Sequence, residues 1–138
     1  MKLQIITPKK LTVDTEITSI TLPTPDGDIT VLPHHQPLLS LLTEGIIVFR
    51  KDNNEEALAI GGGYVETDGF SMKVLVSRAY GQDEIDEKLT QEAIELAKVL
   101  LAESHVPANK AEAESLMRRS LIDSKLLGRY KTRKNNSN

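Results

Sequence analysis

The sequence predicts an α+β protein: an N-terminal antiparallel β-sandwich, residues 1–83, followed by a C-terminal antiparallel α-helical hairpin, residues 84–138. The first observation is the distribution of turn residues, because 7 of the 8 glycines and 5 of the 6 prolines lie before residue 84. The second is a series of short β-type runs in the same part. The third is a change to helical periodicity after it. A chain of 138 residues is long enough to bury a core without disulfides.

Apolar and β-branched runs follow one another through the first part, at the spacing typical of a sandwich or barrel. In the last run, Phe70, Met72, Val74 and Val76 alternate with mostly polar residues, so we predict that these four side chains face the core. The pair Asp68-Gly69 just before it predicts a two-residue hairpin turn of the primed type. The predicted strands span residues 2–7, 17–22, 29–32, 38–42, 46–50, 57–60, 64–67 and 70–76.

Beyond Gly81 the apolar residues recur at helical spacing. Asp83 is the predicted N-cap of a first helix, since its carboxylate can accept from free backbone N–H groups. Val106-Pro107 ends this helix, and a second helix is predicted from about residue 108 to about residue 127. The apolar stripe predicted to pack in the hairpin consists of Ile85, Leu89, Ala93, Leu96 and Leu100.

The composition excludes several kinds of site. There is no cysteine, so disulfides, zinc-thiolate sites and thiol nucleophiles are ruled out, and a reducing compartment is favoured. The apolar run at the N-terminus is too short for a signal peptide, and no run approaches the length of a membrane span. We therefore expect a soluble, cytosolic chain.

The net charge of -3 conceals an uneven distribution. Residues 1–83 carry 7 basic and 11 acidic side chains, residues 84–117 carry 3 and 8, and residues 118–138 carry 7 and 1. An acidic body with a basic tail indicates either an acidic partner or a solvated end.

Two adjacent histidines, His34 and His35, stand between Pro33 and Pro37. They could form a metal site, supply a catalytic base, or belong to a rigid loop that another protein recognises. On a strand-like backbone their side chains point in opposite directions, and no third ligand lies at useful spacing, so a metal site is disfavoured. Recognition by a partner and simple exposure to water both stay open.

A run of three glycines, residues 61–63, is the other feature that suggests chemistry. It lacks the lysine and the Ser or Thr of a phosphate-binding loop, and a strand-like segment follows it. A close approach of two backbones or a bulge explains it better. No pattern indicates a catalytic triad or a paired-carboxylate cleft, so we predict no catalytic, cofactor-binding or metal-binding residues.

Three stretches together resemble the ε subunit of the F-type ATP synthase. Residues 27–38, GDITVLPHHQPL, resemble the family pattern GELGxLPGHxPL. Residues 61–67, GGGYVET, resemble SGGxxEV, and residues 81–86, GQDEID, resemble GQDxD. The three stretches occur in the order and at the spacing of the family, and the resemblance covers nearly the whole chain. Three positions depart from the family pattern, because His34 and Thr30 replace glycines and Gly61 replaces a serine.

The resemblance implies a non-catalytic rotor subunit in the central stalk of the synthase. The sandwich would dock on the γ subunit and on the membrane ring of c subunits, and so couple hydrogen ion transport to ATP synthesis. Asp28 and His35 match the positions of the c-ring contact, with Pro33 and Pro37 stiffening the loop. The implied location is the cytoplasmic face of the cell membrane, peripheral and through the complex only.

In the family the last helix can extend to the catalytic α and β subunits and inhibit ATP hydrolysis. Arg118, Lys125 and Arg129 fall within about 40° of one another on a helix, so they form a basic stripe suited to an acidic partner. A solvated face on a terminal helix is the alternative.

Relatives that bind ATP in the hairpin share a motif of Ile or Leu, Asp, two variable residues, Arg and Ala. Here only Ile85 and Asp86 match, because Leu89 and Thr90 occupy the last two positions, so we predict little or no ATP binding. A stand-alone module that binds a small ligand such as a nucleotide remains the alternative function. A nucleic-acid binder is disfavoured by the acidic body and by the lack of aromatic residues among the basic ones.

Overall fold

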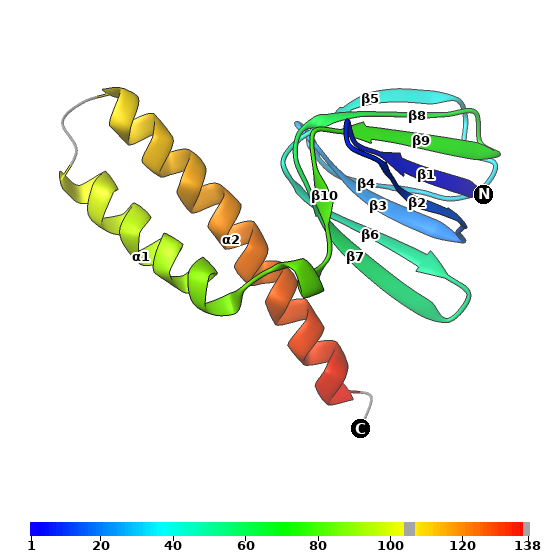
Figure 1. Ribbon diagram of the computed structural model, residues 1–138. Coiled ribbons are helices and arrows are strands. Elements are labelled where there is room, and N and C mark those ends of the chain that lie inside the picture. The colour runs from blue at the N-terminus through cyan, green and yellow to red at the C-terminus, as the bar shows by residue number, and fades with distance from the viewer. Residues whose placement is uncertain (104–106, 137–138) are drawn as a thin grey trace. The chain divides into compact units, whose positions relative to one another are not determined.

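The computed structural model describes residues 1–103 and 107–136, and within them the chain forms ten strands, one short 3₁₀ helix and two α-helices. The chain divides into two compact units, Met1–Tyr80 and Gly81–Asn138 (Figure 1). The first unit holds the described strands and the second holds the described helices, which confirms the predicted sandwich followed by a helical hairpin. The boundary between the two units follows Tyr80, three residues before the boundary after residue 83 that the sequence predicts.

Two five-stranded sheets form the first unit. One sheet contains β1 (Lys2–Ile6), β2 (Leu11–Glu16), β5 (Leu38–Leu42), β8 (Gly63–Thr67) and β9 (Ser71–Val76), in the order β2-β1-β9-β8-β5. The other contains β3 (Ser19–Thr24), β4 (Gly27–Val31), β6 (Gly45–Lys51), β7 (Asn54–Ile60) and β10 (Ala79–Tyr80), in the order β10-β7-β6-β3-β4.

The pairing is antiparallel between all described neighbours but one. β1 and β9 run parallel, with Leu3 opposite Met72 and Ile5 opposite Val74, so the purely antiparallel expectation was wrong for this pair. Two strands, β2 and β10, were not predicted. β2 is an edge strand whose sequence LTVDTE is mostly polar or half-exposed, so it lacks the apolar run by which strands are recognised.

The core lies between the two sheets and follows the period-two alternation of strands. Phe49 is the largest fully buried side chain, with Leu3, Ile5 and Ile47 also buried. Burial of each such side chain contributes about 1.5–3 kcal/mol to folding. In the last predicted strand Met72, Val74 and Val76 are buried as expected, whereas Phe70 precedes β9 and is 67% exposed, contrary to the prediction.

The strand registers give the sandwich two ends. The loop of residues 32–37 and the turn of residues 68–70 lie at one end, which we call the foot. Residues 43–44, 61–62 and 77–78 cross between the sheets at the opposite end.

The glycine run at this opposite end confirms the predicted close approach of backbones. A Cβ added at Gly61 would collide with the Ser77 hydroxyl, and one at Gly63 would collide with the Leu75 carbonyl oxygen. A strand, β8, follows the run, as the sequence indicates.

The second unit begins with a 3₁₀ turn, η1 (Gln82–Glu84), and α1 (Glu87–Glu103) starts after it. Asp86, rather than the predicted Asp83, caps α1, because its Oδ1 accepts from the backbone N–H of Leu89 at 3.0 Å. α2 (Pro107–Asn136) runs well beyond the predicted end near residue 127. The predicted break includes Val106, which lies outside the described residues.

α1 packs on α2 through a different face from the one predicted. Thr90, Ile94 and Ala97 are its buried residues, whereas Leu89, Leu96 and Leu100 are exposed. The two faces are about 100° apart on the helix. In α2, Ala113, Ser120 and Leu126 are buried. Among the described helices none is long and apolar enough to span a membrane.

Candidate docking surfaces

The loop at the foot is held in one conformation by its backbone. His34 has φ +69°, in the left-handed region that glycine adopts easily and histidine seldom. Its N–H donates to the carbonyl oxygen of Gly69 at 2.8 Å, and the N–H of His35 donates to that of Leu32 at 3.2 Å. The position where the family pattern has glycine therefore keeps a left-handed backbone in this chain.

The turn beside this loop is an Asp-stabilised turn and differs from the predicted two-residue primed turn. Thr67 pairs with Met72, so four residues separate the paired positions. Asp68 Oδ1 accepts from the backbone N–H groups of Ser71 at 2.8 Å and Phe70 at 2.9 Å. These two hydrogen bonds lower the pKa of Asp68 below its ordinary value of 3.8, since they favour the charged form.

The loop and the turn are in contact. Gly69 has φ +94°, and a Cβ added there would come within 2.5 Å of the carbonyl oxygen of His35. The Thr67 hydroxyl accepts from the N–H of Gly69 at 3.0 Å and donates to the carbonyl oxygen of Ser71 at 2.8 Å. The foot is therefore a rigid surface made by two segments that are far apart in the sequence.

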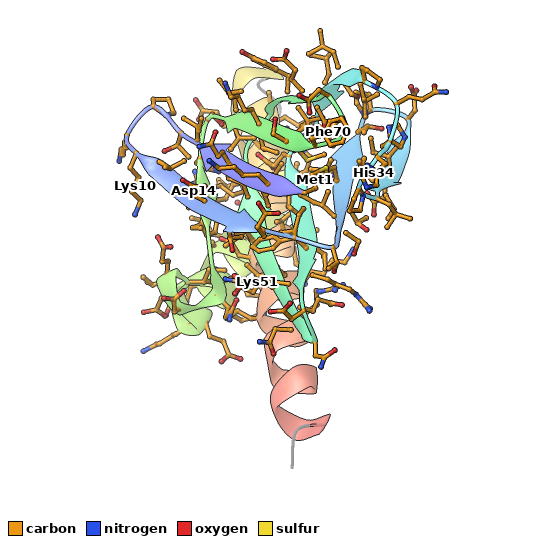
Figure 2. The ribbon with its side chains drawn as sticks, turned by 90° about the vertical axis from the view of Figure 1, so that its right-hand side faces the viewer. Met1, Lys10, Asp14, His34, Lys51 and Phe70 are labelled. Carbon is orange, nitrogen blue, oxygen red and sulfur yellow. The ribbon has the colours of Figure 1, made fainter. Side chains whose placement is uncertain are left out.

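Figure 2 looks onto the foot, with His34 and Phe70 near each other. Their ring centroids are 5.5 Å apart at an interplanar angle of 80°, an edge-to-face contact. Sequence reasoning missed Phe70 as a surface residue, because its place in the apolar alternation predicts burial.

The two histidines do not converge on a common ligand. His35 Nδ1 lies 2.7 Å from the carbonyl oxygen of Gln36, and since a carbonyl oxygen only accepts, Nδ1 is the donor of this hydrogen bond. His34 contacts Phe70 instead. Within residues 1–103 and 107–136, no group of three or more His, Asp or Glu side chains is placed to hold a metal ion.

The residues expected to contact the c ring lie along β4 and the loop that follows it. Asp28 is exposed on β4, an edge strand, where it pairs with Pro23 near the end opposite the foot. His35 and Pro37 are exposed at the foot, and Pro33 is half-buried. Asp28 stands about 10 Å along the strand from Val31, so the structure does not bring it together with His35.

A second surface is apolar and lies on the outer face of the first sheet. Leu39 and Leu41 on β5 are 72% and 68% exposed, and Tyr64 on β8, which pairs with Leu41, is 42% exposed. The sequence signal for this surface is the run LLSLL, because its leucines occupy both faces of the strand. Three neighbouring exposed apolar side chains of this size are typical of a protein interaction site.

The basic stripe lies on α2, where Arg118, Lys125 and Arg129 are all exposed. Ile122, between them, is half-buried. The stripe is therefore exposed on α2. Arg129 also interacts with another group of the chain.

The two matching residues of the ATP motif, Ile85 and Asp86, lie just before α1. Asp86 is engaged in capping α1. Leu89, in the arginine position, is 61% exposed and does not pack in the hairpin as predicted. An exposed leucine offers no donor to a phosphate.

Comparisons with known proteins identify the family of the chain. Residues 1–82 match the family model described as ATP synthase, Delta/Epsilon chain, beta-sandwich domain. The ATP synthase epsilon chain of Sulfurovum sp. is 41% identical over 102 residues, covering 71% of this chain and 80% of the relative. That of Moorella thermoacetica is 32% identical over 129 residues, covering 93% and 96%.

Solved structures show the same fold. A chain in the Euglena gracilis mitochondrial ATP synthase structure, described as OSCP/F1/c-ring, matches with a TM-score of 0.82 and 21% identity, covering 91% of this chain and 79% of that one. A chain in the Tetrahymena thermophila ATP synthase structure, described as central stalk/c-ring, matches with a TM-score of 0.64 and 17% identity, covering 90% and 93%. The chain therefore belongs to the epsilon-chain family of the ATP synthase, a family of non-catalytic subunits.

Proposed function

We propose that this chain is a central-stalk rotor subunit that couples ion flow through the c ring to ATP synthesis in the catalytic head. The observation that carries the proposal is the presence of two separate preformed surfaces on one β-sandwich. One is the rigid foot with the adjoining β4 edge, and the other is the apolar face of Leu39, Leu41 and Tyr64. A torque-transmitting part needs two attachments joined by a stiff body.

The apolar face is the proposed γ-docking surface. Docking there would remove three large apolar side chains from water, and each buried methylene contributes about 0.8 kcal/mol. Because Leu39 and Leu41 lie on a sheet strand, they need little ordering when the partner binds.

The foot and the β4 edge form the proposed c-ring contact, with Asp28, Pro33, His35 and Pro37 as the contact residues. The hydrogen bonds of His34 and Gly69 fix the loop before it docks, which lowers the entropy cost of association. This contact would hold the chain peripherally at the cytoplasmic face of the cell membrane, as part of the synthase.

Co-purification with γ tests the first surface. The double variant Leu39→Ser, Leu41→Ser should retain little γ, whereas Leu11→Ser, an equally apolar side chain 50% exposed on the opposite edge strand β2, should retain it fully. Equal retention of γ by the double variant, the control and the wild type would exclude this face as the docking surface.

The basic stripe on α2 is the proposed inhibitory element. Arg118, Lys125 and Arg129 would steer the helix onto an acidic segment of the catalytic subunits and so slow ATP hydrolysis. Reversal of all three charges to Glu should relieve inhibition of hydrolysis by this chain. The matched control reverses Lys88, Lys98 and Lys110, three exposed lysines of the same hairpin outside the stripe, and should leave inhibition unchanged.

A further inference from the structure

The left-handed backbone of His34 is the starting observation. A histidine at φ +69° persists only when its surroundings determine the conformation, and such strained residues gather at sites of ligand contact. The matching position of the family pattern is glycine, which adopts this backbone freely. The chain therefore carries an imidazole ring at a place where the backbone alone requires none.

The ring of His34 contacts an aromatic side chain. It meets the ring of Phe70 edge to face at 5.5 Å, while its backbone N–H donates to Gly69, the residue before Phe70. The side chain and the backbone of His34 thus both contact the turn of residues 68–70.

Phe70 is held on a fixed backbone while its ring stays in water. Its N–H donates to Asp68 Oδ1 at 2.9 Å, and its carbonyl oxygen accepts from the N–H of Lys2 at 3.0 Å. The side chain is nevertheless 67% exposed. A large aromatic side chain on a rigid turn loses little conformational entropy on binding, as anchor residues of interfaces do.

We propose that His34 and Phe70 form an aromatic anchor that extends the c-ring contact beyond the loop of residues 32–37. The inference rests on the proposed function, which places that loop on the ring. The N–H of His34 donates to the carbonyl oxygen of Gly69, and the rings of His34 and Phe70 are in contact, so a partner that covers the loop would also reach the turn that carries Phe70. The occupant is the polar loop of the c ring, with an apolar or cationic side chain opposite the exposed aromatic face.

The test is equilibrium binding of the full-length chain to the purified c ring of the same synthase in detergent. Phe70→Ser should weaken binding about tenfold or more, the loss typical of a central interface aromatic. His34→Gly keeps the left-handed backbone and removes the ring, and it should weaken binding in the same direction by a smaller factor. Leu11→Ser removes a comparably exposed apolar side chain at the opposite end of the sandwich and should bind like the wild type.

The outcomes separate this inference from the proposed function. A wild-type chain that does not bind the ring overturns both. A wild-type chain that binds, with Phe70→Ser binding equally well and melting normally, overturns the anchor alone. Binding to ring-free liposomes that is lost in Phe70→Ser would assign the aromatic surface to lipid instead and would also overturn the inference.

Discussion

Glu44 and Arg78 form an ion pair, with Glu44 Oε2 and Arg78 Nη2 2.5 Å apart, that joins two of the connections crossing between the sheets. Glu44 lies between β5 and β6, and Arg78 lies between β9 and β10, just before the chain leaves the sandwich for the hairpin. A Cβ on Gly61 would come within 2.9 Å of Arg78 Nη1, so the connection of residues 61–62 packs against the same guanidinium group. The pair therefore fixes the last segment of the sandwich.

Replacing Glu44 with Gln should lower the free energy of unfolding by about 1–2 kcal/mol, because a partly buried guanidinium loses its charged acceptor. Urea denaturation measures the loss. Glu55→Gln, which breaks the exposed pair of Arg50 and Glu55, is the matched control and should cost about 0.5 kcal/mol or less. Equal losses in the two variants would mean that the Glu44–Arg78 pair has no special structural role.

His34→Ala should be less stable than His34→Gly by about 1 kcal/mol, because alanine keeps the strain of a left-handed backbone and glycine removes it. Both variants lose the contact with Phe70, so their comparison isolates the backbone. Thermal unfolding of the two proteins at one pH provides the measurement. An alanine variant as stable as the glycine variant would show that the loop relaxes out of the left-handed conformation.

Asp68 should make stability depend on pH at the acid end. Its pKa is lower in the folded chain than its ordinary value of 3.8, so its contribution is complete above 3.8 and is lost as the pH falls through the folded value. Asp68→Asn should therefore be less stable than the wild type at neutral pH, and the difference should shrink below pH 3.8. Denaturation curves at a series of pH values test this, and a gap that stays constant through the acid range would contradict it.

The isolated chain should bind magnesium-ATP with a dissociation constant no tighter than about 1 mM. Asp86 caps α1, and the exposed Leu89 replaces the arginine of the motif, so the hairpin lacks a bidentate phosphate donor there. Calorimetric titration decides the matter. Leu89→Arg is the companion variant, because it restores the arginine of the motif. Saturable micromolar binding by the wild type would show that other residues form a site.

The fold was predictable where one physical signal dominated. The strand 38–42 and the division into sandwich and hairpin follow from apolar runs and from the glycines and prolines between them. The face of α1 was not predictable in this way, because Leu89, Leu96 and Leu100 form as good a stripe as Thr90, Ile94 and Ala97. The choice depends on how α2 packs against α1, and the periodicity of α1 alone does not contain that information.

The candidate surfaces were predictable only in part, for a similar reason. The prolines and histidines of the loop stand out in the sequence, and the structure places His35 and Pro37 on the surface. Phe70 was assigned to the core because alternation says nothing about where a turn ends. Its exposure depends on the hydrogen bonds of Asp68 and on the contact of Gly69 with a loop more than 30 residues away.

Reconstitution of a synthase that lacks this subunit tests the central claim most directly. The measurement is ATP synthesis driven by an ion gradient, with the full-length wild-type chain or with the Leu39→Ser, Leu41→Ser variant added back. The account predicts that the wild type restores coupled synthesis and that the variant restores little of it. A wild-type chain that assembles into the complex without restoring synthesis would contradict the assignment of this protein as the coupling part of the rotor.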